Sequence, residues 1–290
     1  MSGNDFYFVI EGDIHGRVEN GQPKLHTYKE NPGTRFQKIS SKYPLDFALC
    51  VGDLTNHGYD GTTGNIFESC INKDTNRSQN ELAAFRNLYE KDVENTGIPM
   101  YLCIGNHDMP AGHKGVGEYV RDKHNTTWPF FQSKWYGGNY KFKHAGVMFL
   151  CLGVYPNNLK WLEDNLPAVG RPVVIWYHYN TVIGERWSDF WTKQDKFKFA
   201  DVIDGHNVLC ICNGHSHDTT IGMFSNVYTV RGSGADAAIV HIKDDKLAEI
   251  YFDSGTGINV STTDRRARFD RWRSGSGSDV AAYNADNHND

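Results

Sequence analysis

Short apolar runs that end in glycine or a polar motif recur along the chain and predict buried β-strands. The strands expected on this basis span residues 6–10, 45–51, 98–104, 173–177 and 208–212. Apolar residues at helical spacing predict an amphipathic helix over 78–94. Shorter helices are expected at 35–41, 113–124, 159–166 and 189–203. This alternation of strands and helices is typical of an α/β fold.

The later part of the chain contains apolar runs that are separated by turns. Residues 140–144 and 147–152 predict a β-hairpin that turns at Ala145-Gly146. Further antiparallel strands are expected at 227–230, 237–242 and 247–252. Strand–helix units followed by antiparallel strands predict a mixed α/β sandwich.

Two segments lack the pattern of a packed core. Residues 59–76 are rich in Gly, Thr and Asn and are expected to form a long loop. Residues 262–273 carry five arginines against two aspartates, and a Gly/Ser-rich polar tail follows them. We therefore expect one domain over residues 1–260 and a flexible segment over 261–290. We expect the arginines either to lie on a last strand or helix that is exposed to solvent, or to make an electrostatic contact with an anionic substrate or partner.

The formal net charge of −5 over 290 residues argues against nucleic-acid binding, which favours a basic face. The six cysteines lie mostly in predicted strands, so we expect buried free thiols and no disulfide framework. No apolar stretch approaches the roughly 20 residues that span a bilayer, and the first residues lack the basic start of a signal peptide. We therefore expect a cytoplasmic protein without membrane contact.

Polar motifs stand at the ends of five predicted strands. They contain Asp13 and His15, then Asp53, then Asn106, His107 and Asp108, then His178, and finally His215 and His217. Carboxylate, imidazole and amide groups are the ligands of two-metal hydrolytic sites, in which paired cations clamp a phosphoryl group. The glycines at 12, 52, 105 and 214 indicate tight turns at the strand ends. We therefore expect all five motifs to meet at one edge of a single sheet.

The spacing of the motifs indicates how side chains reach the metals. Asp13 and His15 leave a strand at alternate positions, so both can reach one metal. His215 and His217 have the same spacing, so each can serve a different metal. Two divalent cations, Asp13, Asp53 and a bridging hydroxide leave a net charge of about +1, which attracts a phosphate oxygen. Coordination also lowers the pKa of water toward about 7.

The order Asp-x-His, Gly-Asp, Gly-Asn-His-Asp, His and Gly-His-x-His resembles the calcineurin-like metallophosphoesterase superfamily over about residues 6–252. The resemblance implies an α/β fold, a four-layer α/β/β/α sandwich of two mixed sheets flanked by helices. It also implies a phosphoester hydrolase in which a metal-bridging hydroxide attacks phosphorus. Two metal ions are expected, and the ligand types allow Mn, Fe, Zn, Ni, Co or Mg.

By the same resemblance, the two metals share Asp53. The first metal would be bound by Asp13, His15, Asp53 and His217, and the second by Asp53, Asn106, His178 and His215. His107 would stabilise the transition state or protonate the leaving oxygen. Asp108 would orient His107 by accepting a hydrogen bond from its imidazole.

Departures from known subfamilies narrow the expected substrate. Protein Ser/Thr phosphatases of the superfamily carry Asp-Arg-Gly in the second motif, where this chain has Leu54-Thr55-Asn56-His57-Gly58 after Asp53. Purple acid phosphatases place a tyrosine ligand where Asn56 stands. The motif is more similar to class III cyclic-nucleotide phosphodiesterases and related enzymes of small substrates. We expect a small phosphodiester or phosphomonoester substrate, with a protein Ser/Thr phosphatase or a metal-dependent interaction scaffold as alternatives.

Substrate contacts are expected close to the metal motifs. Arg17, Asn56 and His57 are the candidates, and His113 also follows a ligand motif closely. The other histidines outside the motifs, including His26, are expected to have structural roles. The aromatic residues within 128–139 form either the core of an insertion or a wall of the substrate site. The oligomeric state stays open.

Overall fold

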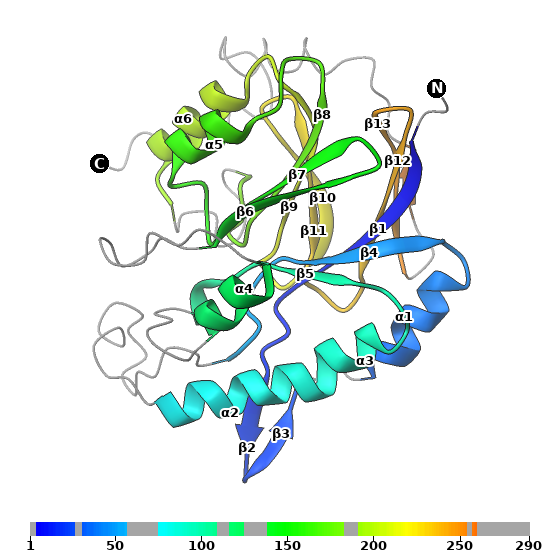
Figure 1. The fold of residues 1–290 in the computed structure, drawn as a ribbon, viewed down its shortest axis with the longest axis vertical. Coiled ribbons are helices and arrows are strands. Elements are labelled where there is room, and N and C mark those ends of the chain that lie inside the picture. Colours follow the sequence, from blue (N-terminus) through cyan, green and yellow to red (C-terminus); the bar gives the residue numbers. More distant parts are fainter. Residues whose placement is uncertain are drawn as a thin grey trace.

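Two six-stranded sheets form the centre of the molecule (Figure 1). The computed structural model describes residues 4–26, 31–56, 75–108, 116–124, 138–182, 191–253 and 257–259. The first sheet has the order β14 (Gly257–Asn259), β13 (Lys246–Phe252), β12 (Ala238–Lys243), β1 (Asp5–Glu11), β4 (Leu45–Cys50) and β5 (Met100–Leu102). The second has the order β10 (Thr219–Phe224), β11 (Val227–Gly232), β9 (Asn207–Asn213), β8 (Pro172–Trp176), β7 (Val147–Leu152) and β6 (Asn139–His144).

Both sheets are mixed. In the first sheet, β1 runs parallel to β4 and antiparallel to β12, with Val9 opposite Ala48 and Ile239. In the second sheet, β7, β8, β9 and β11 are parallel, and β6 and β10 are antiparallel edge strands. The expected hairpin at 140–152 is confirmed. The strand at 227–230 is antiparallel only to β10, because its other neighbour, β9, runs parallel to it.

Side chains along β1 alternate between two cores, as the period of a strand requires. Phe8 and Ile10 lie in the core between the two sheets, where they meet side chains such as Trp176 of β8. Val9 belongs to the core on the helical side of the sheet. The uninterrupted apolar run at 6–10 is explained by burial on both faces.

Helices cover the outer faces of the two sheets (Figure 1). On the first sheet lie α1 (Pro32–Ser40), α2 (Thr75–Phe85), η3 (Arg86–Glu90), α3 (Lys91–Glu94) and α4 (Val116–His124). On the second lie α5 (Leu159–Asn165) and α6 (Lys193–Ile203). This arrangement confirms the expected four-layer α/β/β/α sandwich.

The helix expected at 78–94 contains a π-helical turn, η3, between α2 and α3. A π-helical turn is wider than an α-helical turn, and here the consecutive residues Tyr89 and Glu90 within it are both buried. The Tyr89 hydroxyl donates to the carboxylate of Glu11, the last residue of β1. The helix is thereby joined to the strand that leads into the first metal motif.

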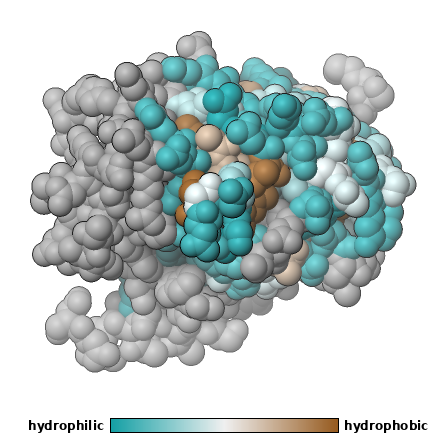
Figure 2. All heavy atoms as spheres, turned by 90° about the horizontal axis from the view of Figure 1, so that it is seen from below, coloured by the Kyte–Doolittle hydropathy of each residue, from teal (hydrophilic) through white to brown (hydrophobic). Residues whose placement is uncertain are grey.

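A small hairpin of β2 (Arg17–Glu19) and β3 (Gln22–Lys24) packs against α2. The sequence does not predict it, because both strands are short, polar and mostly exposed. The strands β10 and β14 are also unpredicted, since β10 is only half-buried and β14 has three residues. On the face that contains α2 and this hairpin, hydrophobic residues occupy a small central area among hydrophilic ones (Figure 2).

Five cysteines in the described part of the chain are buried free thiols, as expected. Among the described helices, none is both long enough and apolar enough to cross a membrane. Several expectations fall outside the described residues. They concern most of the loop at 59–76, His57, His113, the aromatic residues at 128–136 and the segment 261–290.

Candidate metal centre

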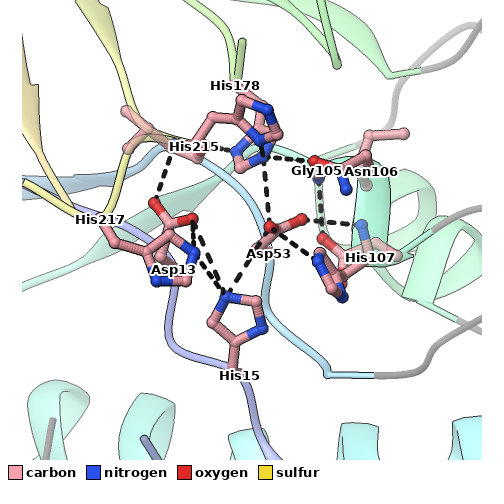
Figure 3. Close-up of polar contacts among 12 residues, drawn as sticks. Asp13, His15, Asp53, Gly105, Asn106, His107, His178, His215 and His217 are labelled. Atoms are coloured by element: carbon pink, nitrogen blue, oxygen red, sulfur yellow. Dashed lines mark hydrogen bonds and ion pairs between the residues drawn. The ribbon is translucent and has the colours of Figure 1, made fainter. Parts of the chain in front are cut away.

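Motifs from both sheets meet at one place (Figure 3). From the first sheet, Asp13 and His15 follow β1, Asp53 follows β4, and Asn106 and His107 follow β5; from the second, His178 follows β8, and His215 and His217 follow β9. The expectation of a single sheet edge is therefore wrong. The sheets pack face to face, so the ends of strands from both supply side chains from two directions.

The first group of possible metal ligands contains Asp13, His15, Asp53 and His217, whose ligand atoms lie within 4.8 Å of one another. His217 Nε2 lies 3.2 Å from Asp13 Oδ1 and 3.3 Å from His15 Nε2. His15 Nε2 lies 3.8 Å from Asp53 Oδ2. Asp13 Oδ2 accepts the backbone N–H of His215 at 3.0 Å, so Oδ1 is the oxygen that faces the group.

The second group contains Asp53, His178 and His215. His178 Nε2 lies 3.2 Å from both Asp53 Oδ2 and His215 Nδ1. The amide oxygen of Asn106 lies 2.9 Å from the same nitrogen. His178 Nδ1 donates to the carbonyl oxygen of Val51 at 2.8 Å, which directs Nε2 into the group. Asp53 therefore stands between the two groups and belongs to both.

These donors fit a pair of metal ions. Ligand atoms that are each about 2.1 Å from one metal stand roughly 3.0–3.4 Å apart, close to the 3.2 and 3.3 Å separations found here. Asp13 Oδ1 and Asp53 Oδ2 are buried and accept no hydrogen bond of ordinary geometry. Buried carboxylate oxygens require positive charge beside them, which the imidazoles of His178 and His217 can supply when protonated and which metal ions would supply when bound. A set of carboxylate, imidazole and amide ligands suits first-row divalent metals.

Left-handed backbone recurs at the candidate ligands. Five of them have φ between 50° and 70°, namely Asp13, His15, Asp53, His215 and His217. Side-chain-bearing residues seldom adopt this left-handed region, and strain of this kind is common at functional sites. Among the motif glycines, Gly52 alone has positive φ, at 96°. Gly105 is required by close approach, since a Cβ there would lie 2.1 Å from Asp53 Oδ1.

The charges of the site are coupled. Burial alone would raise the pKa of Asp53, but the positive charges of His178 and His107 hold it well below its usual value. Burial alone would lower the pKa of His178, but Asp53 raises it to about 9. Burial lowers the pKa of His15 and His215 to about 3. Without metals, a proton on His178 therefore balances Asp53, while His15 and His215 keep a lone pair for a cation.

Asp108 joins two loops and does not orient His107. Its buried carboxylate accepts the backbone N–H groups of Leu54 at 3.1 Å, Thr55 at 2.9 Å and Gly105 at 2.8 Å, and the hydroxyl of Thr55 at 2.9 Å. Four donors fill the acceptor capacity of a carboxylate. His107 Nδ1 instead donates to the carbonyl oxygen of Asn56 at 2.7 Å. The expected bond from the His107 imidazole to Asp108 is therefore wrong.

His107 is partly exposed and lies beside the buried Asp53. Its backbone N–H donates to Asp53 Oδ1 at 2.8 Å, and its Nε2 lies 4.0 Å from Asp53 Oδ2. The side chain is 27% exposed, whereas that of Asp53 is 1% exposed. The bond from Nδ1 to a carbonyl oxygen fixes the orientation of the ring, which places Nε2 on the side of Asp53.

The candidate substrate contacts have different surroundings. The side chain of Arg17 pairs with Glu19 Oε1 at 2.7 Å within the small hairpin. The backbone N–H of Asn56 donates to Gly16 O at 3.0 Å, and its carbonyl oxygen accepts a hydrogen bond from His107.

The sequence does not identify His26 as part of the centre. The centroid of its ring lies 6.0 Å from the ring centroids of both His15 and His217. No local pattern in the sequence marks His26, because its place beside the centre depends on the β2–β3 hairpin that brings the chain back.

Comparison with known proteins gives one family and several similar folds. A family model described as calcineurin-like phosphoesterase matches residues 6–219. None of the curated proteins matches this chain in sequence. A dimetal phosphatase from Danio rerio is similar in structure with a TM-score of 0.53 and 12% identity, over 88% of this chain and 99% of that one.

Two further solved structures resemble the chain. Purple acid phosphatase PPD1 from yellow lupin (Lupinus luteus) has a TM-score of 0.56 and 11% identity, over 89% of this chain and 53% of that one. GAP50, the anchor in the inner membrane complex of Plasmodium, has a TM-score of 0.55 and 11% identity, over 95% of this chain and 96% of that one. At such low identity, these likenesses show a shared fold.

Proposed function

Since this chain belongs to the calcineurin-like phosphoesterase family, we propose that it is a two-metal hydrolase of small phosphodiesters or phosphomonoesters. The observation that carries the proposal is the convergence of two ligand groups on Asp53, with buried carboxylate oxygens that accept no ordinary hydrogen bond. A site that had lost its metals would not need to keep both groups together. The proposed partner is a small phosphoester, and we further propose a cytoplasmic location, which the buried free thiols support.

Each metal is proposed to take one of the two ligand groups. Asp13, His15, Asp53 and His217 would hold the first ion, and Asp53, Asn106, His178 and His215 the second. Asp53 Oδ2 supports the bridging role, because it lies 3.8 Å from His15 Nε2 and 3.2 Å from His178 Nε2. We leave the metal open among Mn, Fe, Zn, Ni, Co and Mg, since the ligand types suit several of them.

When bound, the two metals supply positive charge and a hydroxide nucleophile near neutral pH. His107 is proposed to donate from Nε2 to the leaving oxygen, because its Nδ1 is held by the Asn56 carbonyl. Asp108 keeps the loop of His107 against the loop of Asp53 through its backbone acceptors. The small-substrate preference is supported by the second motif, Leu54-Thr55-Asn56-His57-Gly58, which lacks the Asp-Arg-Gly of protein phosphatases.

The proposal is tested with metal-stripped protein to which each of the six metals is restored separately. We expect metal-dependent hydrolysis of p-nitrophenyl phosphate, bis-p-nitrophenyl phosphate or both, and loss of turnover in Asp53→Asn. Asp46→Asn is the matched control, because Asp46 is an exposed residue at the other end of β4. A purified phosphoprotein offered in parallel distinguishes a protein phosphatase from an enzyme of small substrates.

Absence of turnover with every metal would overturn the hydrolase proposal. A protein that still binds two metals but cleaves no ester would instead be a metal-dependent interaction scaffold. The fold is compatible with such a role, since it is shared with GAP50, which is described as an anchor.

A further inference from the structure

The small hairpin of β2 and β3 returns the chain to the metal centre. It leaves the first motif at Gly16, where α2 packs so closely that a Cβ would lie 2.8 Å from the Glu81 carbonyl oxygen. After the hairpin, Leu25 is buried in the core and the backbone N–H of His26 donates to Ile14 O at 3.1 Å. His26 is thereby held beside the loop that carries Asp13 and His15.

The imidazole of His26 lies at the edge of the first ligand group. Its centroid is 6.0 Å from that of His15, with the planes at 54°, and 6.0 Å from that of His217, with the planes at 81°. His26 is half-buried and does not belong to the group whose ligand atoms lie within 4.8 Å of one another. It therefore stands one layer outside the ligands.

Besides His26 and the ligand His217, His15 has His107 as a histidine neighbour. Their centroids are 4.7 Å apart with the planes at 86°. Both His107 and His26 are partly exposed, while His15 is buried. Two partly exposed imidazoles outside the ligand groups thus border the same buried ligand, and of these two only His107 has a role in the proposed reaction.

The chemistry of phosphoesters gives His26 a use. A phosphodiester has two non-bridging oxygens, and a two-metal site can take one on each ion. A phosphomonoester has a third non-bridging oxygen, which carries additional negative charge and needs a donor of its own. Hydrogen bonds to charged oxygens are about twice as strong as neutral ones.

We propose that His26 is a specificity-determining residue that donates a hydrogen bond to the third non-bridging oxygen of a phosphomonoester. The inference rests on the proposed function and makes monoesters the favoured substrate class. His26 acts from the first-metal side, and His107 serves the leaving oxygen.

The test measures binding as well as turnover. Inorganic phosphate and dimethyl phosphate are titrated calorimetrically into manganese-loaded wild type, His26→Ala, His26→Gln and His144→Ala. Phosphate retains the third oxygen, and dimethyl phosphate lacks it. His144→Ala is the control, because His144 is a partly exposed histidine at the distant turn of the β6–β7 hairpin. Metal content is measured for every protein.

We expect His26→Ala to bind phosphate about 10-fold more weakly or worse, the loss of a hydrogen bond to a charged group. Dimethyl phosphate affinity, metal content and the control should stay within about 2-fold of wild type, because only the third oxygen loses its donor. His26→Gln retains a side-chain donor and should recover part of the loss. The ratio of kcat/KM for p-nitrophenyl phosphate to that for bis-p-nitrophenyl phosphate should fall in parallel with phosphate affinity.

Equal losses for both ligands, loss of metal, or unchanged phosphate binding in His26→Ala would each overturn the inference. Those results leave the proposed function intact as long as the wild type binds metal and hydrolyses an ester. If the wild type itself binds neither metal nor phosphate, the proposed function and the inference fail together.

Discussion

The amide Nδ2 of Asn180 donates to Ser216 Oγ at 3.0 Å, and both residues are buried. Asn180 lies two residues after His178, and Ser216 lies between His215 and His217. This bond joins the segments that follow β8 and β9. These two segments supply ligands to both metal groups, so the bond holds those ligands in place relative to one another.

Arg231 supports the same contact from β11. Its Nη1 donates to Asn180 Oδ1 at 2.9 Å, and its Nε donates to Asp218 Oδ1 at 2.8 Å. The side chain of Arg231 is 4% exposed, so these partners compensate for the removal of its charge from water.

Replacing Asn180 by alanine should weaken both the fold and the second metal group. The change removes a buried hydrogen bond from Ser216 and another from Arg231, which costs about 2–4 kcal/mol of unfolding free energy. Urea unfolding of the metal-free protein measures the loss, and metal titration should show weaker binding of one ion. Asn165→Ala is the control, because the side chain of Asn165 donates to a carbonyl of its own helix. Equal effects of the two changes would contradict the role of Asn180.

Replacing Asp108 by asparagine should disturb catalysis without removing a ligand. An amide offers one acceptor oxygen, so its NH2 group would face donors that the carboxylate now accepts. We expect a loss of about 2–4 kcal/mol in unfolding free energy and reduced kcat. Metal content at saturating metal should persist. Wild-type stability and turnover in Asp108→Asn would show that the loops do not depend on this carboxylate.

Gly105→Ala should prevent normal assembly of the centre, because the added Cβ would lie 2.1 Å from Asp53 Oδ1. Asp53 belongs to both ligand groups, so we expect both metals to bind weakly. Gly97→Ala is a matched control, since Gly97 has φ of 85° and a Cβ added there would meet no atom within 4 Å. It should cost only about 1 kcal/mol of backbone strain. Normal metal content in Gly105→Ala would contradict the close approach.

The pH dependence of stability should contain a contribution from His124 at the end of α4. Burial, and then the charge of Lys123, lower the pKa of His124 to about 3. Its Nε2 accepts the backbone N–H of Leu102 at 2.9 Å, which requires the neutral ring. The unfolded chain takes up a proton near pH 6.5 and the folded protein does not. This contribution is therefore complete above pH 6.5 and is lost as the pH falls toward 3.

Unfolding free energies between pH 7 and 4.5 test this expectation. The contribution of His124 should fall by roughly 1.4 kcal/mol per pH unit below pH 6.5. His124→Gln removes the titration, so its stability should depend less steeply on pH across the same range. Parallel curves for the two proteins would assign the pH dependence to other groups.

Local patterns predict the strands that carry the metal motifs. The apolar runs before Asp13, Asp53, Asn106, His178 and His215 all form strands, because burial on both faces of a central strand leaves a continuous hydrophobic signature. The order and chemistry of the motifs also indicate the family and a two-metal centre. These features depend on short stretches of sequence, in which side-chain type and period are sufficient.

Contacts between distant segments were not predictable in this way. The π-helical turn that buries both Tyr89 and Glu90 has no signature in the spacing of apolar residues. The analogy with general-acid histidines predicts a bond between Asp108 and His107, yet the structure brings backbone donors from the loop after β4 to the Asp108 carboxylate. The hydrogen-bond partners of Asp108 depend on which loops pack together in the folded protein.

The α/β class, the buried strands and the kinds of ligand follow from the amino-acid sequence, because hydrophobic period and side-chain chemistry are local properties. The fold adds that two sheets share the centre, that Asn180 joins the ligand segments of β8 and β9, and that His26 returns to the edge of the centre. These relationships join residues far apart in sequence. The packing of the two sheets and of the β2–β3 hairpin sets the distances between these residues, and no local sequence pattern predicts that packing.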